Sequence, residues 1–463
     1  MENTENKIRH IYCIEGNWNK HPHSNQSIKP ILDLLFTFSK IKYIYKKCIT
    51  KRDFIKGLQS FTQKRYSNYT VLYIAYHGRK NRICIGNEYI TLKEIADVLE
   101  GKLNGIIVHI GSCSTLNTTE KNITDFIKNC TDCWHTVQEV CKTLDSIGFV
   151  RLDEGADWKL ENGVRYYVTR NMSSVTAFKI PKSLPEGYMI AAAHGESPSF
   201  KIKAVPELTD KNYVRLNVEA YGGMVLSSWL DRPLSVSGRI VADIGGELSF
   251  RLVNIDRDSL IIPSLAPHLS RGAEGSNSLN IRRDMPPMYA LSNGYKGILK
   301  EAADTLGIPK ESITGCDLML YNREPARIWG QNGEFISAPR LDDLQCVYAL
   351  LKGFAECGDS ADTVQTLCVF DNEEVGSGTK QGAKSDFLSS VLLRISMCLG
   401  LSYGKHMQCL NSSFLVSADN AHAIHPNRPD AYDASNYPVI NGGIVIKYNA
   451  AQRYTTDAVS EAV

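Results

Sequence analysis

The stretch Tyr188-Met189-Ile190-Ala191-Ala192-Ala193-His194 predicts a strand that ends in an imidazole side chain. Two other apolar runs predict strands that are followed by acidic groups: 364–370 precedes Glu373 and Glu374, and 414–417 precedes Asp419. In open α/β sheets, neighbouring strands deliver functional side chains to one crevice beyond their carboxyl ends. The three runs therefore predict an α/β sheet with one shared site.

A further acidic residue, Asp342, stands 148 residues after His194. Connections within an α/β unit usually take only ~2–6 residues. An inserted domain at 206–333 is the economical explanation. It would divide one α/β domain into a first part at 121–205 and a second part at 334–463, which begins with Asp342 and a predicted helix at 344–354.

These residue types together predict a metal centre. An isolated His or Asp after a strand is usually a cap or a surface group, but several at neighbouring strand ends favour metal binding. Asp342 can bridge two zinc ions ~3.5–4 Å apart, and such a pair lowers the pKa of a shared water. Glu374 would then bind one ion, which leaves Glu373 free for general acid/base work. This arrangement predicts peptide hydrolysis from the amino end.

The composition predicts a soluble chain of two modules. The 463 residues carry a formal net charge of +2, but residues 1–120 hold 18 Lys/Arg against 10 Asp/Glu, and the rest is acidic. No apolar run reaches the ~18 residues that a membrane span needs, and the start of the chain is polar. Thirteen scattered cysteines fit a reducing compartment. We therefore expect a cytoplasmic protein with no membrane partner.

The first 120 residues alternate strand-like and helix-like pieces, which is typical of a parallel α/β sheet. The candidate strands are 9–14, 41–45, 70–76 and 105–110. Thr91 and Glu94 have the spacing of a capping box that opens a helix, and 117–122 reads as a linker. The basic residues are dispersed and lack a nucleic-acid-binding motif, so we expect no nucleic-acid partner.

His77 and Cys113 follow two of these strands and stand 36 residues apart. A His-Gly after one strand and a Cys after the next resembles the caspase-like clan of cysteine peptidases. In that clan the imidazole accepts the thiol proton and the thiolate attacks a carbonyl. Only four strands are visible, so the resemblance is to a partial module. The alternative is a structural His77 and an inert, buried Cys113.

From about residue 123 to its end, the chain resembles the aspartyl aminopeptidase family. Four motifs carry the resemblance: AAHGESP at 192–198, APRLDDL at 338–344, DNEEVGS at 371–377 and SADNAHAIHPN at 417–427. The resemblance implies an α/β/α catalytic domain, two zinc ions per subunit and an inserted, β-rich dimerisation domain. It also implies large homo-oligomers built from dimers, such as a dodecamer, and peptide substrates with amino-terminal Asp or Glu.

The resemblance also implies a role for each site residue. His194 and Asp419 would bind one zinc, Asp342 would bridge, Glu374 would bind the second zinc, and Glu373 would be the general base. Glu196 would support His194 from behind. The implied substrate-binding residues are Lys447 and Tyr454 in IKYNAAQRY at 446–454, His422, and His268, which would reach a neighbouring subunit's site.

Two departures from the family pattern leave alternatives open. Glu196 stands where the family has Asp, so its hold on His194 is expected to be displaced. The sequence stops at Val463, before the late His that the family supplies to the second zinc, so a C-terminally truncated chain with a weakened second site is expected. One alternative is therefore a non-catalytic scaffold, and another is a cysteine peptidase that uses His77 and Cys113.

Overall fold

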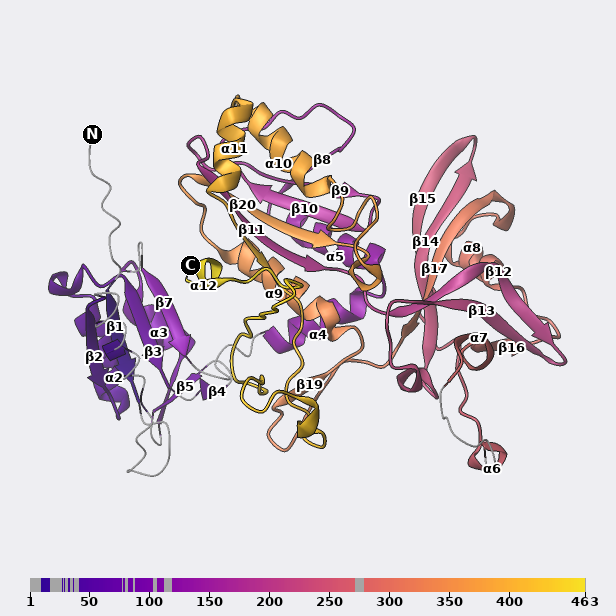
Figure 1. Cartoon of the computed structure of the whole chain (residues 1–463), viewed down its shortest axis with the longest axis horizontal. Helices are drawn as coiled ribbons and strands as arrows, with labels where there is room; N and C mark the ends of the chain where they lie inside the picture. The colour runs from indigo at the N-terminus through magenta and orange to yellow at the C-terminus, as the bar shows by residue number, and fades with distance from the viewer. Residues whose placement is uncertain are drawn as a thin grey trace. The chain divides into compact units, whose positions relative to one another are not determined.

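The computed structural model describes residues 10–16, 27, 29, 32, 33, 36, 41–76, 78, 79, 82–85, 88–102, 106–111, 119–270 and 279–462. The chain divides into two compact units (Figure 1). One unit comprises Met1–Asn122 with Pro426–Val463, and the other is Ile123–His425. The four domain limits given above stay predictions.

A six-stranded mixed sheet forms the centre of the larger unit. Its strand order is β21-β11-β20-β10-β9-β8, with β21 (Phe414–Ser417), β11 (Gly187–His194) and β20 (Thr363–Phe370) parallel to one another. The remaining strands are β10 (Ser174–Lys179), antiparallel to both neighbours, β9 (Arg165–Arg170) and β8 (Val150–Leu152). The three strands predicted to meet at one site are therefore adjacent, which confirms that prediction.

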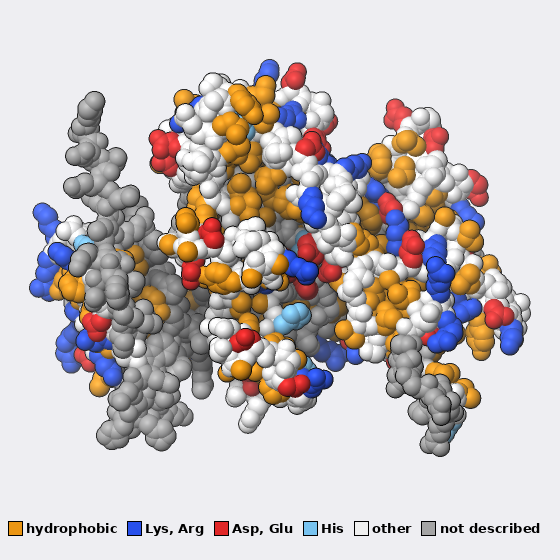
Figure 2. All heavy atoms as spheres, in the orientation of Figure 1, with side chains coloured by type: hydrophobic (Ala, Val, Ile, Leu, Met, Phe, Trp, Pro, Cys, Tyr) orange, Lys and Arg blue, Asp and Glu red, His pale blue; other side chains and the backbone are white. Residues whose placement is uncertain are grey.

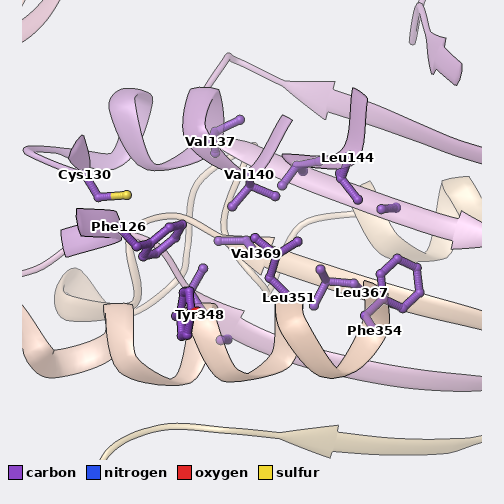
Figure 3. Packing of buried hydrophobic residues seen from close by; sticks show 14 of the residues in the cluster. Phe126, Cys130, Val137, Val140, Leu144, Tyr348, Leu351, Phe354, Leu367 and Val369 are labelled. Carbon is purple, nitrogen blue, oxygen red and sulfur yellow. The ribbon is translucent and has the colours of Figure 1, made fainter. Parts of the chain in front are cut away.

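Helices cover both faces of this sheet. One face packs against α5 (Cys133–Ser146) and α9 (Leu341–Glu356), and the other packs against α10 (Phe387–Cys398) and α11 (Tyr403–Asn411). Figure 3 shows side chains of α5 and α9 meeting Leu367 and Val369 of β20 in the first of these cores. β20 is apolar on both faces because both of them are covered. The α/β/α arrangement agrees with the predicted fold class.

The larger unit holds a second sheet, antiparallel throughout, with the order β15-β14-β17-β12-β13-β16, and we call the segment 199–322 that contains it the inserted domain. Its strands are β12 (Ser199–Asp210), β13 (Tyr213–Tyr221), β14 (Leu234–Ile244), β15 (Glu247–Asn254), β16 (Met288–Leu291) and β17 (Ile313–Asn322). Alternate residues of these strands and α8 (Ile298–Leu306) enclose a separate apolar core. On the face in Figure 2, basic and acidic side chains are interspersed over this domain.

The short elements of the larger unit lie mostly in its connections. They are α6 (Pro267–Ser270), α7 (Ile281–Asp284), the β18–β19 hairpin (Arg327–Trp329 and Phe335–Ser337) and the 3-10 turns η2 (Leu226–Trp229), η3 (Lys310–Ser312) and η4 (Glu373–Val375). The hairpin and η4 matter most for the site, because they stand directly before the Asp342 turn and after β20.

The smaller unit contains the predicted parallel sheet. Its order is β2-β1-β3-β7, formed by β1 (Ile11–Glu15), β2 (Tyr43–Lys47), β3 (Val71–Ala75) and β7 (Ile107–Gly111). Helices α2 (Lys51–Phe61) and α3 (Leu92–Leu99) belong to this unit, and the Thr91–Glu94 capping box is present. A small antiparallel sheet adds β4 (Gly78–Arg79), β5 (Arg82–Ile85) and β6 (Glu88–Thr91). Its other short elements are η1 (Lys64–Tyr66), η5 (Pro429–Ala431) and α12 (Ala458–Glu461).

The predicted linker at 117–122 is wrong in its second half. Helix α4 spans Thr119–Asn129, so the polar residues from Thr119 onward are helical. Phe126 and Ile127 of α4 are buried in the core against α9, which explains why the helix forms despite its polar first turns.

Among the described residues, no helix is long and apolar enough to cross a membrane.

Candidate active site

The site lies where three parallel strands end. His194 is the last residue of β11 and pairs with Phe370, the last residue of β20, while Ala192 pairs with Ser417, the last residue of β21. The residues that follow each strand therefore emerge at the same edge of the sheet. This register brings His194, the Glu373–Glu374 turn and Asp419 together, as the strand-end argument predicted.

Asp342 and Asp343 reach this edge from the start of α9. The backbone at both residues is not helical, and the peptide bond between them is cis. The regular helix therefore begins only after Asp343. Asn420 holds the neighbouring turn, because its Nδ2 donates to the carbonyl of Leu341 at 2.8 Å.

Two groups of donor atoms result, and His194 belongs to both. In the first, one ligand atom each of His194, Asp342, Asp343 and Asp419 lie within 4.8 Å of one another. In the second, His194, Glu373 and Glu374 meet the same criterion. His194 Nε2 lies 3.6 Å from Asp342 Oδ1 and 4.0 Å from Asp343 Oδ2. All of the predicted metal residues are thus brought together, and Asp343 joins them.

Glu196 lies next to the imidazole of His194, on the side of its Nδ1 atom. Nδ1 of His194 is 3.1 Å from the backbone carbonyl of Glu196 and 3.5 Å from its carboxylate Oε2. The other oxygen, Oε1, accepts from the backbone N–H of Glu374 at 3.1 Å. The longer side chain therefore reaches past His194 and contacts the Glu373–Glu374 turn.

The electrostatics of the site favour a bound cation. Burial raises the pKa of Asp343 to about 7, and burial with the nearby charges of Asp342 and Glu373 raises the pKa of Glu374 to about 7. Burial alone lowers the pKa of His194, but the carboxylates of Asp342 and Glu196, 3.6 Å and 3.5 Å from its ring nitrogens, raise it to about 11. Several carboxylates therefore crowd one imidazole, a charge distribution that a divalent cation relieves.

The donor set is compatible with zinc. One imidazole nitrogen and several carboxylate oxygens are ligand types that zinc accepts. Among the described residues, Asp343 Oδ1 of the first donor group is buried without a hydrogen-bond partner, and Glu196 Oε2 has only the ring nitrogen Nδ1 of His194 nearby, at 3.5 Å. Such orphaned acceptors are costly unless a cation or donor satisfies them.

Two site residues were missed by the sequence argument. Asp343 is fully buried and its Oδ2 accepts from the backbone N–H of His194 at 3.3 Å. The adjacent acidic residues Asp342 and Asp343 in the sequence could have indicated that Asp343 also lies at the site. Tyr221 ends strand β13 of the inserted domain and also reaches the site, and no local pattern indicates that role.

Beside the site, a cavity of 1130 Å³ lies where the inserted domain joins the catalytic sheet. Asp342, Glu196, Tyr221 and Asn372 are among its lining residues. The candidate donor groups therefore border a partly open cavity that residues of both sheets line.

The remaining predicted residues are not in the two donor groups. His422 is exposed on the segment after Asp419, and His268 is exposed in α6 of the inserted domain. Lys447 Nζ lies 5.4 Å from the ring centroid of Tyr454 within the smaller unit. His77 and Cys113 lie outside the described residues. The roles predicted for these residues stay predictions.

Comparison with known proteins agrees with this geometry. The family model "Aminopeptidase I zinc metalloprotease (M18)" matches residues 126–463, and a family of unknown function matches residues 8–146. A "Probable M18 family aminopeptidase 2" of Clostridium novyi is 40% identical over 351 residues, which is 73% of this chain and 80% of that protein.

Solved structures show the same fold. Chaetomium thermophilum mApe1 is 30% identical with a TM-score of 0.69, over 74% of this chain and 83% of that one. The S. cerevisiae mApe1 dodecamer is 26% identical with a TM-score of 0.60, over 70% of this chain and 76% of that one. The family model and the Clostridium relative each span most of this chain. The chain therefore belongs to the M18 family of zinc aminopeptidases, which are hydrolases.

Proposed function

We propose that this M18 aminopeptidase removes amino-terminal Asp and Glu residues from peptides. The observation that supports it most is the convergence of His194, Asp342, Asp343, Asp419, Glu373 and Glu374 at one edge of the sheet. A hydrolase of this kind needs a donor set for metal and a separate acid/base group, and these six residues can supply both.

The proposed roles divide the six residues between binding and proton transfer. His194 and Asp419 would hold one zinc, Asp342 would serve both ions, and Glu374 would hold the second. Asp343 is fully buried and accepts from the backbone N–H of His194, so its proposed role is to hold the His194 backbone in place. When bound, zinc acidifies water and polarises the scissile carbonyl.

Glu373 performs the proton transfer in this proposal. It is exposed, whereas its neighbour Glu374 is half-buried, so the two adjacent carboxylates differ in their access to solvent. Glu373 takes a proton from the attacking water and returns it to the leaving amine.

The proposed preference for amino-terminal Asp and Glu depends on Lys447. A cationic side chain in the matched IKYNAAQRY segment suits a substrate carboxylate, because charge-assisted hydrogen bonds to carboxylates are strong. The ring of Tyr454 lies 5.4 Å from Lys447 Nζ, so the two residues can act together.

The test compares kcat/KM for aspartyl, glutamyl and leucyl amides of one chromogenic amine. We expect Asp and Glu to be preferred, and Lys447→Ala to lower the aspartyl value ~10–100-fold, the effect of ~1.5–3 kcal/mol, with little change for leucine. Lys405→Ala, at an exposed lysine of α11, serves as the control. Equal rates for all three amides would refute the acidic preference.

We also propose a homo-oligomer built from dimers through the inserted domain. The S. cerevisiae relative is described as a dodecamer, and strand β15 carries the exposed apolar residues Leu248 and Phe250. Light scattering on the purified chain measures the mass. A monomer at micromolar concentration would contradict this assembly.

A cysteine-peptidase activity of the smaller unit is a second candidate. Strands β3 and β7 are parallel neighbours, and the pair Ala75↔Gly111 has the same 36-residue offset as His77 and Cys113. Limiting iodoacetamide would then label Cys113 before the exposed thiols of Cys316 and Cys357. His77→Ala would remove that preference. Slower labelling of Cys113 than of these thiols would dismiss this candidate.

A further inference from the structure

Tyr221 of the inserted domain contacts residues that adjoin the two donor groups. Tyr221, the last residue of β13, accepts a hydrogen bond from Asn372 Nδ2 at 2.8 Å and donates to Glu196 Oε1 at 3.4 Å. Asn372 directly precedes Glu373, and Glu196 stands two residues after His194. One phenol thus touches both turns that deliver ligands from strands β11 and β20.

The two partners of this phenol are themselves fixed around the ligands. Glu196 Oε1 also accepts from the backbone N–H of Glu374 at 3.1 Å, and the Glu196 side chain is only 5% exposed. Asn372 Oδ1 accepts from Thr379 Oγ1 at 2.7 Å and from Gln381 Nε2 at 2.8 Å, so its amide group is oriented with the nitrogen toward Tyr221. Removing the phenol oxygen therefore deprives a buried carboxylate and an oriented amide of a partner at once.

The next residue of the inserted domain lies against a proposed ligand. Gly222 has φ +76°, and a Cβ placed there would be 2.9 Å from Cβ of Glu374 and 3.4 Å from its Oε2. Only glycine allows this approach without strain. Gly223 differs completely, because a Cβ there would meet nothing within 4 Å. The close contact is thus specific to one position of the turn.

We propose that Tyr221 and Gly222 form a positioning turn of the inserted domain, which holds Glu196 and the Glu373–Glu374 turn in the geometry that binds metal. Tyr221 acts through Glu196 and Asn372, and Gly222 acts by its close packing on Glu374. The inserted domain then contributes to the metal centre of its own chain, in addition to any role in assembly. This inference rests on the proposed ligand roles of His194 and Glu374.

The first test replaces the phenol by an isosteric ring. We expect Tyr221→Phe to keep the far-ultraviolet circular dichroism of the wild type but to bind zinc ~10–100-fold more weakly, the usual effect of losing a group that supports ligands. Zinc affinity is measured by competition with a chromophoric chelator, and bound Co²⁺ reports the ligand geometry through its visible spectrum.

The control for this test is Tyr289→Phe. Tyr289 also gives its hydroxyl to a carboxylate of the inserted domain, Glu301 Oε2 at 2.5 Å, but neither residue belongs to the donor groups. We expect its zinc affinity to match the wild type. Wild-type affinity in Tyr221→Phe would overturn the inference alone, whereas a wild-type chain that binds no zinc would overturn the proposed function as well.

The second test uses the two adjacent glycines. We expect Gly222→Ala to displace Glu374, lower zinc affinity and change the Co²⁺ spectrum, while Gly223→Ala leaves both unchanged. If Gly222→Ala and Gly223→Ala changed zinc affinity and the Co²⁺ spectrum equally, the cause would be the lost flexibility of the turn. That result would contradict a specific role for Gly222 in placing Glu374.

Discussion

Glu196 contacts three separate parts of the site. The family resemblance implies a shorter acid at this position, so we expected a displaced contact with His194. His194 Nδ1 lies 3.1 Å from the backbone carbonyl of Glu196 and 3.5 Å from its carboxylate. The carboxylate instead accepts from Glu374 and Tyr221. One residue thus links an imidazole, a ligand turn and the inserted domain.

Glu373 is the residue whose substitution tests the chemistry most directly. We expect Glu373→Gln to lower kcat ~10²–10⁴-fold, the usual contribution of general acid/base catalysis, while zinc content stays at the wild-type value. Activity on an aspartyl amide and metal analysis of the same sample measure both. Glu311→Gln, an exposed acid of the inserted domain, is the control. A Glu373→Gln enzyme with wild-type kcat would show that another group moves the proton.

Asp317 predicts a pH dependence of stability away from the metal site. Its carboxylate lies 2.9 Å from Lys201 Nζ and 2.7 Å from the Arg239 guanidinium. Burial raises the pKa of Asp317, but the two cations lower it more, so its pKa in the folded state is below the ordinary value. The interaction therefore adds stability above the unfolded pKa of ~3.9 and loses it as the pH falls through the folded-state pKa.

Accordingly, Asp317→Asn should lower the free energy of unfolding at pH 7 by ~1–3 kcal/mol, because two cations lose their partner. The difference from the wild type should shrink below pH ~3.9. Urea unfolding of metal-free protein measures both values. Asp304→Asn breaks an exposed pair with Lys300 and should cost under ~0.5 kcal/mol. A difference that grows on acidification would contradict the assigned sign.

Helices α5 and α9 connect the core to the site at the level of secondary structure. Both bury apolar side chains against the same face of the catalytic sheet, which fixes where their amino-terminal ends lie. Arg340, just before α9, donates to the carbonyls of Ile127, Cys130 and Asn322. The guanidinium therefore ties the Asp342 turn to α4 and to the inserted domain.

The N-cap of α5 offers a test of an element. Asp132 accepts from the backbone N–H of His135 at 2.9 Å and pairs with its Nδ1 at 2.7 Å. We expect Asp132→Ala to lower stability by ~1–2 kcal/mol, whereas Asp132→Asn, which can still cap the helix, should cost less. Thermal unfolding followed by circular dichroism measures the order. Equal losses would show that charge, and not capping, is what matters here.

For the whole molecule, zinc should link activity to stability. A metal that binds only the folded state stabilises it by ~2.7 kcal/mol when its free concentration is 100 times Kd. We therefore expect a chelator to abolish hydrolysis and lower Tm by several degrees, and added Zn²⁺ to restore both. His194→Ala, which loses the residue common to both donor groups, should show no chelator-dependent change. A wild-type Tm that ignores the chelator would favour the non-catalytic scaffold.

The sequence by itself determined the strands and their chemistry. Apolar runs such as 364–370 predicted β20, and the residues after the three parallel strands predicted the shared site, because strand ends at one sheet edge converge. The sequence also predicted the capping box at Thr91, which the structure contains. These features depend on local patterns and on one general rule of sheet topology.

Only the tertiary structure decided the contacts made across long distances. Tyr221 lies on an inserted strand, and its approach to Glu196 and Asn372 depends on how two separately packed cores are joined. The burial of Asp343 depends on where α9 packs, and the polar start of α4 is helical because Phe126 is buried against α9. Residue types and spacing can indicate which groups do chemistry, but burial and partners arise from packing between distant segments.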